Sequence, residues 1–282
     1  MQLSMRLIEP GAVWAIAQRE LRESLRNKWL WFYAVAFAGL ALALSQAGVA
    51  SAGYAGLGGF GRTAASLINA LLLFVPLMGL TVGAGVLAGD RERGTLLYLL
   101  AQPVSRAEVF WGKALGAGLA VLAALAIGFG VAGLGLAATV SGNAQTFLAL
   151  AGYSLLLALA SLGLGFVLSA LTRKASTAAG AAILVWLGLV FFADLGLIGA
   201  ALSLRPSPAM LMTMLLANPL QIFKLAAIYS LRATLDTLGA VGQYATFRYG
   251  EALPLMLLGL LAAWIVATFA LAYFLFDVRG DV

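Results

Sequence analysis

AASLINALLLFVPLMGLTVGAGVLA, which occupies Ala64–Ala88, contains no charged side chain and is followed directly by Gly89-Asp90-Arg91-Glu92-Arg93. A helix needs roughly 20 consecutive apolar residues to cross the hydrocarbon core of a membrane. This stretch is long enough, and the charged sequence after it marks the point at which the chain would leave the membrane. It therefore predicts a membrane-spanning helix, and Pro76 is expected to kink it.

Five more apolar stretches have a similar length, which gives six predicted transmembrane helices. The others are approximately Trp29–Ala50, Ala114–Val140, Phe147–Leu171, Thr177–Ala200 and Pro254–Phe276. Hydrophobic residues make up 63% of the 282 residues and charged residues 10%, and the mean hydropathy is +1.01. Globular proteins are close to half apolar and a quarter charged. The composition therefore excludes a soluble enzyme and predicts an all-α integral membrane protein.

Basic residues outside the predicted spans are divided unequally between the two sides of the membrane. Twelve of the 17 Lys and Arg residues fall on the side that holds both termini, and five fall on the other side. Because Lys and Arg gather on the cytoplasmic side, we expect both termini in the cytoplasm of a multi-pass protein of the inner (cytoplasmic) membrane. The net charge of +6 then reflects topology, and no nucleic-acid partner is expected.

Small residues recur at intervals of four in and after two of the predicted spans. They are Gly79 and Gly83, Gly85 and Gly89, and Ser161, Gly165 and Ser169. Such spacing lets membrane helices approach each other closely. Packing within one bundle explains the pattern, and some of these faces could instead bury a second copy of the chain.

The first 28 residues are predicted to form a cytoplasmic amphipathic elbow helix ahead of a transmembrane domain at residues 29–282. Apolar Val13, Ile16, Leu21 and Leu25 recur at helical spacing, and charged residues fill much of the remaining surface. A helix of this kind lies in the membrane interface, in contact with lipids. It could be a simple anchor on the lipid surface, or a lever that touches a cytoplasmic partner.

The connection at residues 89–113 carries the most specific pattern in the chain. Gly94 allows a sharp turn, and Thr95 is expected to N-cap a short helix over about Leu96–Ala101, which Pro103 ends. Ser105 and Glu108 have the spacing of a capping box, so the third span is expected to start there. The apolar face of the short helix, formed by Leu96, Leu97 and Leu100, would need a groove in a partner or the lipid interface.

The pattern Asp90-Arg-Glu-Arg-Gly-Thr-Leu, followed by Gln102-Pro-Val-Ser-Arg, resembles the coupling loop of ABC-2 type permeases, the membrane subunits of ATP-binding-cassette exporters. The six spans, the elbow helix and the long loop before the last span match as well. The resemblance therefore covers essentially the whole chain and implies the ABC-2 exporter (type V) fold. Trp14–Trp29, Gly59–Ser66 and the coupling loop are most similar to permeases of nitrous oxide reductase maturation transporters.

The resemblance implies partners and a mechanism. Two permease copies would pair with two copies of a cytoplasmic ABC ATPase, and a periplasmic repeat protein and a copper chaperone would be further partners. The short helix would dock in a groove of the ATPase and be pushed when ATP binds. The implied coupling residues are Asp90, Glu92, Arg93, Gly94, Thr95, Leu96, Leu97 and Leu100.

No cofactor and no catalytic residue are expected on this chain. The sequence lacks the phosphate-binding motif Gly-x-x-x-x-Gly-Lys-Ser/Thr, because its one Gly-Lys, at Gly112-Lys113, is followed by Ala114. ATP and Mg²⁺ would therefore bind to the partner ATPase. Cysteine and histidine are both absent, which removes disulfides, Cys or His metal sites, thiol nucleophiles and the usual general base.

The loop at residues 201–253 is expected outside the cytoplasm and should contain a helix of its own. Asn218, Pro219 and Gln221 form a strong helix start, with Asn as the N-cap and Pro at the first position. The helix should continue to about Leu235. It could be a docking platform for a periplasmic partner or a lid that packs on the tops of the spans.

Two further features are candidates for function. Met210, Met212 and Met214 offer thioethers, which suit Cu(I); on a helix, however, residues two apart point to opposite sides, and Met often fills apolar packing. Asp194 is the one acidic residue within a predicted span, and ionisable groups there are functional candidates. It could instead lie near the outer interface, where water or Arg205 satisfies it.

The leading hypothesis is a permease subunit that transports a cargo or transmits force for copper-site maturation of nitrous oxide reductase. The spans contain few polar residues, which favours force transmission or an apolar cargo, so an ABC-2 exporter of a hydrophobic drug or lipid is an alternative. An ion-coupled secondary transporter is an alternative from another class. It would normally show repeats and several buried ionisable groups, which this sequence does not.

Overall fold

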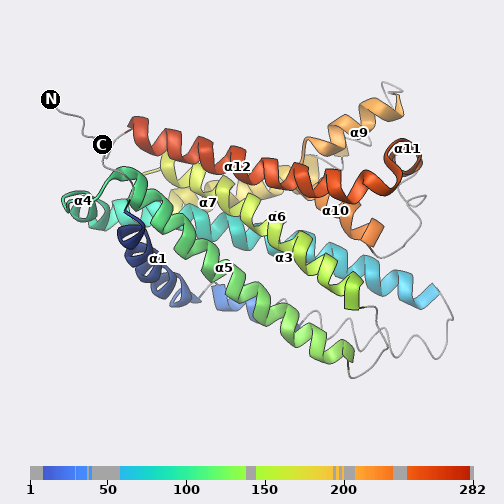
Figure 1. The fold of residues 1–282 in the computed structure, drawn as a ribbon, viewed down its shortest axis with the longest axis horizontal. Helices are drawn as coiled ribbons and strands as arrows, with labels where there is room; N and C mark the ends of the chain where they lie inside the picture. The colour runs from blue at the N-terminus through green and yellow to red at the C-terminus, as the bar shows by residue number, and fades with distance from the viewer. Residues whose placement is uncertain are drawn as a thin grey trace.

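The computed structural model describes residues 9–28, 30–36, 38–39, 58–137, 144–192, 195–196, 199, 207–230 and 240–279. Every regular element in these ranges is a helix, as the composition predicts. The long helices are α3 (Gly58–Glu92), α5 (Arg106–Ala137), α6 (Ala144–Leu171) and α12 (Leu253–Arg279), and they lie side by side along the length of the molecule (Figure 1).

Four helical segments are long and apolar enough to cross a membrane. They are Ile68–Glu92, Arg106–Val131, Phe147–Leu171 and Tyr244–Arg279, and they correspond to the second, third, fourth and sixth predicted spans. A fifth candidate is the pair α9 (Pro208–Leu216) and α10 (Pro219–Ser230), which is bent by 110° at the break between the two helices. The chain is therefore a multi-pass membrane protein.

The first and fifth predicted spans are described only in part. Residues 30–36 and 38–39 are helical, and the rest of the stretch to Ala50 lies outside the described residues. In the fifth, the α-helix α7 (Ala175–Leu187) continues as the π-helix η1 (Gly188–Phe192). The continuous apolar helix that the two form runs from Ala175 to Phe191, which is shorter than the predicted span.

The small residues at intervals of four bring α3 and α6 into backbone contact. A Cβ atom added to Gly79 would lie 2.6 Å from the carbonyl oxygen of Ala158, so the two helices leave no room there for a side chain. Further along, the Ser169 hydroxyl accepts hydrogen bonds from the backbone N–H groups of Leu87 and Ala88, at 2.9 and 2.8 Å. This spacing therefore serves packing within one bundle on the face where α3 meets α6.

The first described helix, α1 (Pro10–Leu25), crosses the start of α5 (Figure 1). Ile16 and Ala17 are buried in this contact. Gly112 and Gly116 of α5 permit the close approach, because a Cβ atom on Gly116 would meet the Ala17 carbonyl oxygen at 2.5 Å. A helix therefore exists over residues 10–25 of the predicted segment, and its Ile16 and Ala17 are covered by the chain's own α5.

The two ends of the bundle carry different elements. A short helix, α4 (Thr95–Leu100), lies at one end together with the C-terminal end of α12. The helices α9, α10 and α11 (Ala240–Tyr249) lie at the other end (Figure 1). The backbone N–H of Glu9 donates to Glu108 at 2.7 Å, and Arg279 donates to the carbonyl of Leu171 at 3.1 Å. Both ends of the described chain therefore lie at the α4 end.

The predicted helix start at Asn218 is confirmed. Asn218 caps α10 by accepting a hydrogen bond from the N–H of Leu220 at 2.9 Å, and Pro219 is the first helical residue. The helix is described as far as Ser230, short of the predicted end near Leu235. Most of α10 is buried against the spans, including Ile222 and Phe223. This burial favours the lid over the docking platform.

Candidate functional site

A left-handed turn joins α3 to the short helix α4. Gly94 has φ 72°, a conformation that glycine adopts without steric cost. The predicted short helix is confirmed, but the prediction that Thr95 caps it is wrong. Gly94 takes the N-cap position and Thr95 is the first helical residue, with its hydroxyl donating to the carbonyl of Asp90 at 3.2 Å. Gly94 takes the cap because the turn after α3 needs a left-handed residue directly before the helix.

The exposed face of α4 differs from the predicted one. Leu96 is fully buried and belongs to the main core of the chain, and Leu100 is half-buried. Leu97 and Tyr98 are 57% and 70% exposed. The prediction that Leu96, Leu97 and Leu100 together face a partner is therefore wrong for Leu96, because that side of the helix packs on the bundle. The residues offered outward are Leu97 and Tyr98.

The predicted capping box fixes the start of α5. The N–H of Ser105 donates to Glu108 Oε2 at 2.7 Å, and the N–H of Glu108 donates to Ser105 Oγ at 3.2 Å. The other carboxylate oxygen, Oε1, accepts the hydrogen bond from Glu9. The Glu108 carboxylate thus caps the start of α5 and also binds the N-cap residue of α1.

Three buried charged side chains meet beneath α4, and we name them the buried triad. The Lys113 ammonium of α5 lies 2.6 Å from Glu20 Oε2 of α1 and 2.5 Å from Asp90 Oδ2 of α3. Their side chains are between 1% and 8% exposed. An isolated buried charge is very costly, so each member depends on the others. Burial raises the pKa of the Glu20 carboxyl, while the positive charge of Lys113 opposes that shift.

Arg93 extends the triad to the surface. Its Nη2 lies 2.8 Å from Asp90 Oδ1 and 2.7 Å from Glu23 Oε1, so it connects the turn before α4 to α1. The hydrogen bond to Asp90 raises the pKa of the Arg93 guanidinium above its usual value. The Arg93 and Glu23 side chains are 56% and 40% exposed, and exposed pairs of this kind contribute little stability.

The neighbouring charges bind backbone atoms of three more helices. Glu92 Oε2 accepts from the N–H of Ala175, the first residue of α7, at 2.8 Å. Arg91 Nη1 donates to the carbonyls of Ser169 and Thr172 at the end of α6, at 3.1 and 2.6 Å. Arg106 donates to the carbonyl of Asp277 in α12 at 2.9 Å.

Together these contacts join the segment around α4 to α1, α5, α6, α7 and α12. The charged side chains of this arrangement are engaged in ion pairs and in hydrogen bonds to other helices. A displacement of α4 would be passed to the backbone of several helices at once. Sequence reasoning found Asp90, Glu92 and Arg93 but missed Glu20 and Lys113. The available signal was a lone lysine at the edge of an apolar stretch, which requires a partner.

The other predicted site residues lie elsewhere. The three methionines lie on α9, where Met212 is 2% exposed while Met210 and Met214 are 50% and 40% exposed. The helix therefore points Met212 away from the other two, and three thioethers do not converge. Among the described residues, no group of three or more carboxylates is placed to hold a metal ion. Asp194 lies outside the described residues.

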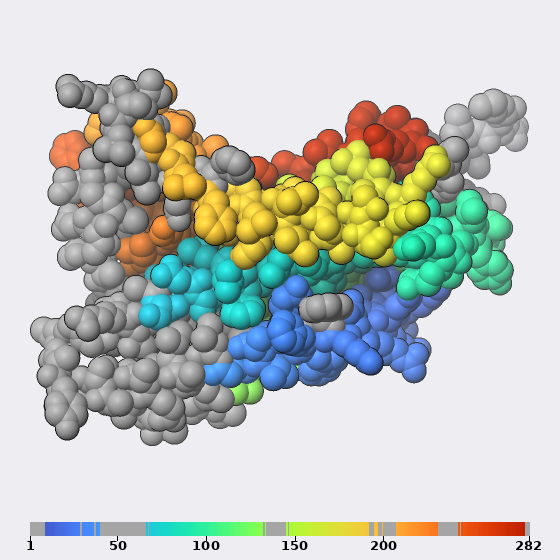
Figure 2. Space-filling view, turned by 180° about the vertical axis from the view of Figure 1, so that it is seen from behind, coloured from blue at the N-terminus to red at the C-terminus, as the bar shows by residue number. Residues whose placement is uncertain are grey.

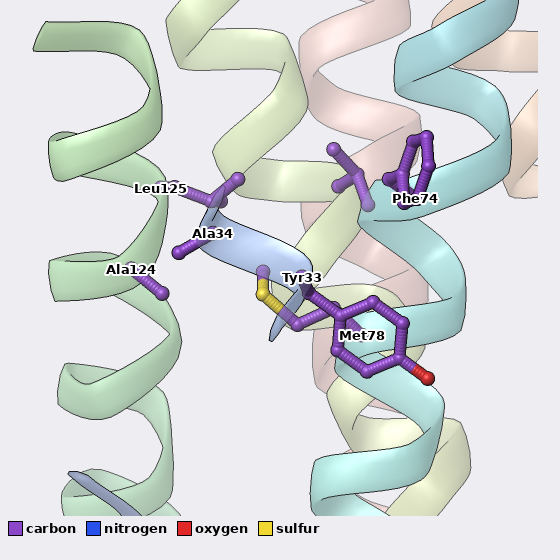
Figure 3. A pocket seen from close by; sticks show the side chains of 7 residues that line it. Tyr33, Ala34, Phe74, Met78, Ala124 and Leu125 are labelled. Carbon is purple, nitrogen blue, oxygen red and sulfur yellow. The ribbon is translucent and has the colours of Figure 1, made fainter. Parts of the chain in front are cut away.

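A small cavity lies between residues 33–34, α3 and α5 (Figure 3). Its volume is about 10 Å³, which is near the minimum for one water molecule. The lining is almost wholly apolar and consists of Tyr33, Ala34, Phe74, Val75, Met78, Ala124 and Leu125. This space is far too small for a cargo.

Comparisons with known proteins find matches along nearly the whole chain. The model of the family described as ABC-2 family transporter protein matches residues 14–280. A probable ABC transporter permease protein NosY of Pseudomonas aeruginosa is 35% identical over 274 residues, which cover 95% of this chain and 98% of the relative. The protein of the same name from Stutzerimonas stutzeri is 34% identical over 276 residues, with the same shares covered.

Proposed function

This chain belongs to the ABC-2 family of transporter proteins, and we propose that it passes the force of a cytoplasmic ATPase across the membrane for copper-site maturation of nitrous oxide reductase. It is a permease subunit, a transport component. The family implies a cytoplasmic ABC ATPase as its partner, so ATP and Mg²⁺ bind to that partner and not to this chain. The family assignment also removes the ion-coupled secondary transporter from consideration.

The observation that carries the proposal is the exposed pair Leu97 and Tyr98 on a helix whose base is joined to five others. An apolar and an aromatic side chain of this size are suited to a groove on a partner protein. The ATPase receives this helix in such a groove. When ATP closes the ATPase dimer, α4 is displaced, and the triad and its neighbouring hydrogen bonds carry the displacement into the spans.

The surrounding assembly follows from the family resemblance and the charge distribution. Two copies of this chain pair with two ATPase subunits in the inner membrane, each with six spans and both termini in the cytoplasm. The helix α1 is the elbow in the cytoplasmic interface, where its exposed Arg19, Arg22 and Arg26 meet lipid headgroups. A periplasmic repeat protein and a copper chaperone are the remaining partners.

Force transmission is preferred to conduction of a solute because the bundle interior is apolar. The largest fully buried side chains in the described residues are all Phe and Leu. A route for an ion or polar cargo would require polar side chains along its length. A hydrophobic drug or lipid would not, so export of such a cargo is the competing function.

The deciding experiment is mass spectrometry of the proteins that co-purify with the tagged chain from native membranes in mild detergent. An ATPase together with a periplasmic repeat protein is the expected result. An ATPase alone would replace the copper-maturation role with export of a hydrophobic cargo. If the chain is recovered intact with its second copy but with no ATPase, the coupling function is wrong.

A further inference from the structure

The helix α7, taken together with its continuation η1, is held near both ends by hydrogen bonds with other elements. At the α4 end, Glu92 Oε2 accepts from the N–H of Ala175 at 2.8 Å. At the opposite end, Asn218 Nδ2 donates to the carbonyl of Leu189 at 2.7 Å. Glu92 ends the span that leads into α4, and Asn218 lies at the break between α9 and α10. One helix therefore contacts both the α4 segment and the opposite end of the bundle.

Between its two ends, α7 lies lengthwise along α3 at the surface of the molecule (Figure 2). Fully buried Ala178 and Ala182 of α7 pack against Leu80, Ala84 and Ala88 of α3, and larger side chains that include Trp186 of α7 pack against the same cluster. The outer side of α7 is apolar and open, and Leu184 is 70% exposed. Because protein interiors are close-packed and transmit strain, a shift of one end of α7 is passed along the helix.

The Asn218 bond meets α7 where its helical geometry changes. Leu189 lies in the π-helical turn η1 (Gly188–Phe192). Such turns interrupt the i→i+4 hydrogen-bond ladder and often mark functional positions. The side chain amide of Asn218 supplies a donor to one of the carbonyls in that turn. The π-turn is thus tied to the outer helices at the point where α7 can most easily deform.

Asn218 uses both ends of its amide in this role. Its Oδ1 caps α10 by accepting from Leu220, and its Nδ2 donates to Leu189. The residue is 9% exposed. An N-cap needs an acceptor and a carbonyl needs a donor, and the Asn218 amide supplies the two from different atoms, whereas an aspartate at this position would keep the acceptor and lose the donor. The side chain connects two helices rather than serving the cap alone.

We propose that α7 carries displacement from the α4 segment to the α9–α10 hairpin, and that Asn218 is the positioning residue that makes the distant connection. The inference rests on the proposed function, because the ATPase supplies the displacement. When α4 moves, Glu92 shifts the first turn of α7, the packed helix moves as a unit, and the η1 turn moves Asn218 with the buried helix α10.

The test uses a dye on the hairpin in the complex of this chain with the ATPase that co-purifies with it. The chain contains no cysteine, so Met210→Cys, on an exposed position of α9, gives one label per copy. In the parent complex, a non-hydrolysable ATP analogue with Mg²⁺ should shift the dye emission and its quenching by iodide. Asn218→Asp keeps the cap oxygen but removes the donor to Leu189, so the shift should be lost.

Two controls separate transmission from general damage. Asn218→Asp should co-purify with the ATPase and hydrolyse ATP as the parent does, because Asn218 lies far from α4. Thr213→Ala, which removes only a bond from Thr213 to carbonyls of its own helix α9, should retain the full dye shift. Retention of the shift in Asn218→Asp, or no shift in a parent complex that hydrolyses ATP, would overturn the inference.

The other end of α7 gives an independent pair of variants. Glu92→Ala removes the acceptor for Ala175 and should abolish the dye shift, whereas Glu92→Gln keeps an acceptor oxygen and should restore it. If Asn218→Asp fails to fold, this pair still decides, because equal shifts in Glu92→Ala and Glu92→Gln would contradict transmission through α7. A parent chain that binds no ATPase would instead refute the proposed function itself.

Discussion

The α4 end and the hairpin end of the bundle are held by different kinds of contact. At the α4 end, the buried triad, the capping box and the Arg91 and Glu92 bonds fix each helix through charged, directional groups. At the other end, α10 is held mainly by burial of apolar side chains such as Ile222, Phe223 and Leu225. Asn218 adds one polar connection.

This difference fits a molecule that is driven at one end and responds at the other. Hydrogen bonds and ion pairs are directional, and in a buried network whose charges are paired, such as the triad, they rigidify the structure around them. Apolar contacts are non-directional, and they can be remade after a small movement. The contrast between a rigid α4 end and an adaptable hairpin end can be tested by substitution.

The largest effect is expected from Lys113→Ala, which should destabilise the folded chain by about 3–5 kcal/mol because Glu20 is then buried without a counter-charge and Asp90 keeps only the partly exposed Arg93. The measurement is thermal unfolding in detergent, with tryptophan fluorescence as the signal. The comparison variant is the triple substitution Glu20→Leu, Asp90→Asn and Lys113→Met, which removes every charge of the triad. It should recover much of the lost stability. A single variant as stable as the parent would show that the triad does not hold the α4 end.

The next largest effect should be on binding rather than folding. Leu97→Asp together with Tyr98→Asp should reduce ATPase co-purification about 30-fold, since losing a central interface anchor costs about 2 kcal/mol or more. The fold should persist because both side chains point outward. Val278→Asp is the matched control, because Val278 is 65% exposed at the same end of the bundle but lies on α12. Equal losses in both variants would mean that α4 is not the docking element.

A smaller loss of stability is expected for a substitution at the α3–α6 contact, and it should be absent at a position of α3 that meets no other helix. Gly79→Ala places a Cβ atom against the Ala158 backbone, and such overpacking should cost about 1–3 kcal/mol. Gly85→Ala meets nothing within 4 Å, so it should be neutral or slightly stabilising, because alanine favours helix. Unfolding temperatures of the two variants give the comparison. A similar loss at both positions would point to helix geometry rather than interhelical contact.

Short-range sequence signals explain the features that the sequence predicts correctly at both ends of the bundle. Apolar length identifies four of the six predicted spans, Ser105 and Glu108 mark the start of α5, and Asn218 with Pro219 marks the start of α10. Each of these signals lies within a few residues of its effect. The side of α4 that faces outward does not follow from spacing, because the rotation of a six-residue helix is set by the helices beneath it. For that reason Leu96 is buried and Tyr98 is exposed.

The missed parts of the site depend on contacts between distant segments. Glu20 and Lys113 are 93 residues apart in sequence, and nothing near either residue indicates that they meet. The same holds for the second bond of Asn218, which reaches 29 residues back to Leu189. Charged and amide groups in an apolar chain indicate that a partner exists, but only the packed structure identifies it.

The smallest effect is expected from the exposed part of the charged cluster, and its dependence on salt separates it from the buried part. Glu23→Gln removes the charge that pairs with Arg93 and leaves the bond between Arg93 and Asp90 in place. The loss of stability should be less than about 1 kcal/mol, since the pair is exposed to solvent. It should shrink further at high salt, where exposed charges are screened within about 3 Å at 1 M.

The loss in Lys113→Ala should change little with salt, because the triad is buried. Unfolding temperatures of both variants at low and high salt provide the measurement. If salt erased the Lys113→Ala effect as well, the triad would behave as a surface cluster, and the rigid coupling attributed to the α4 end would lose its physical basis.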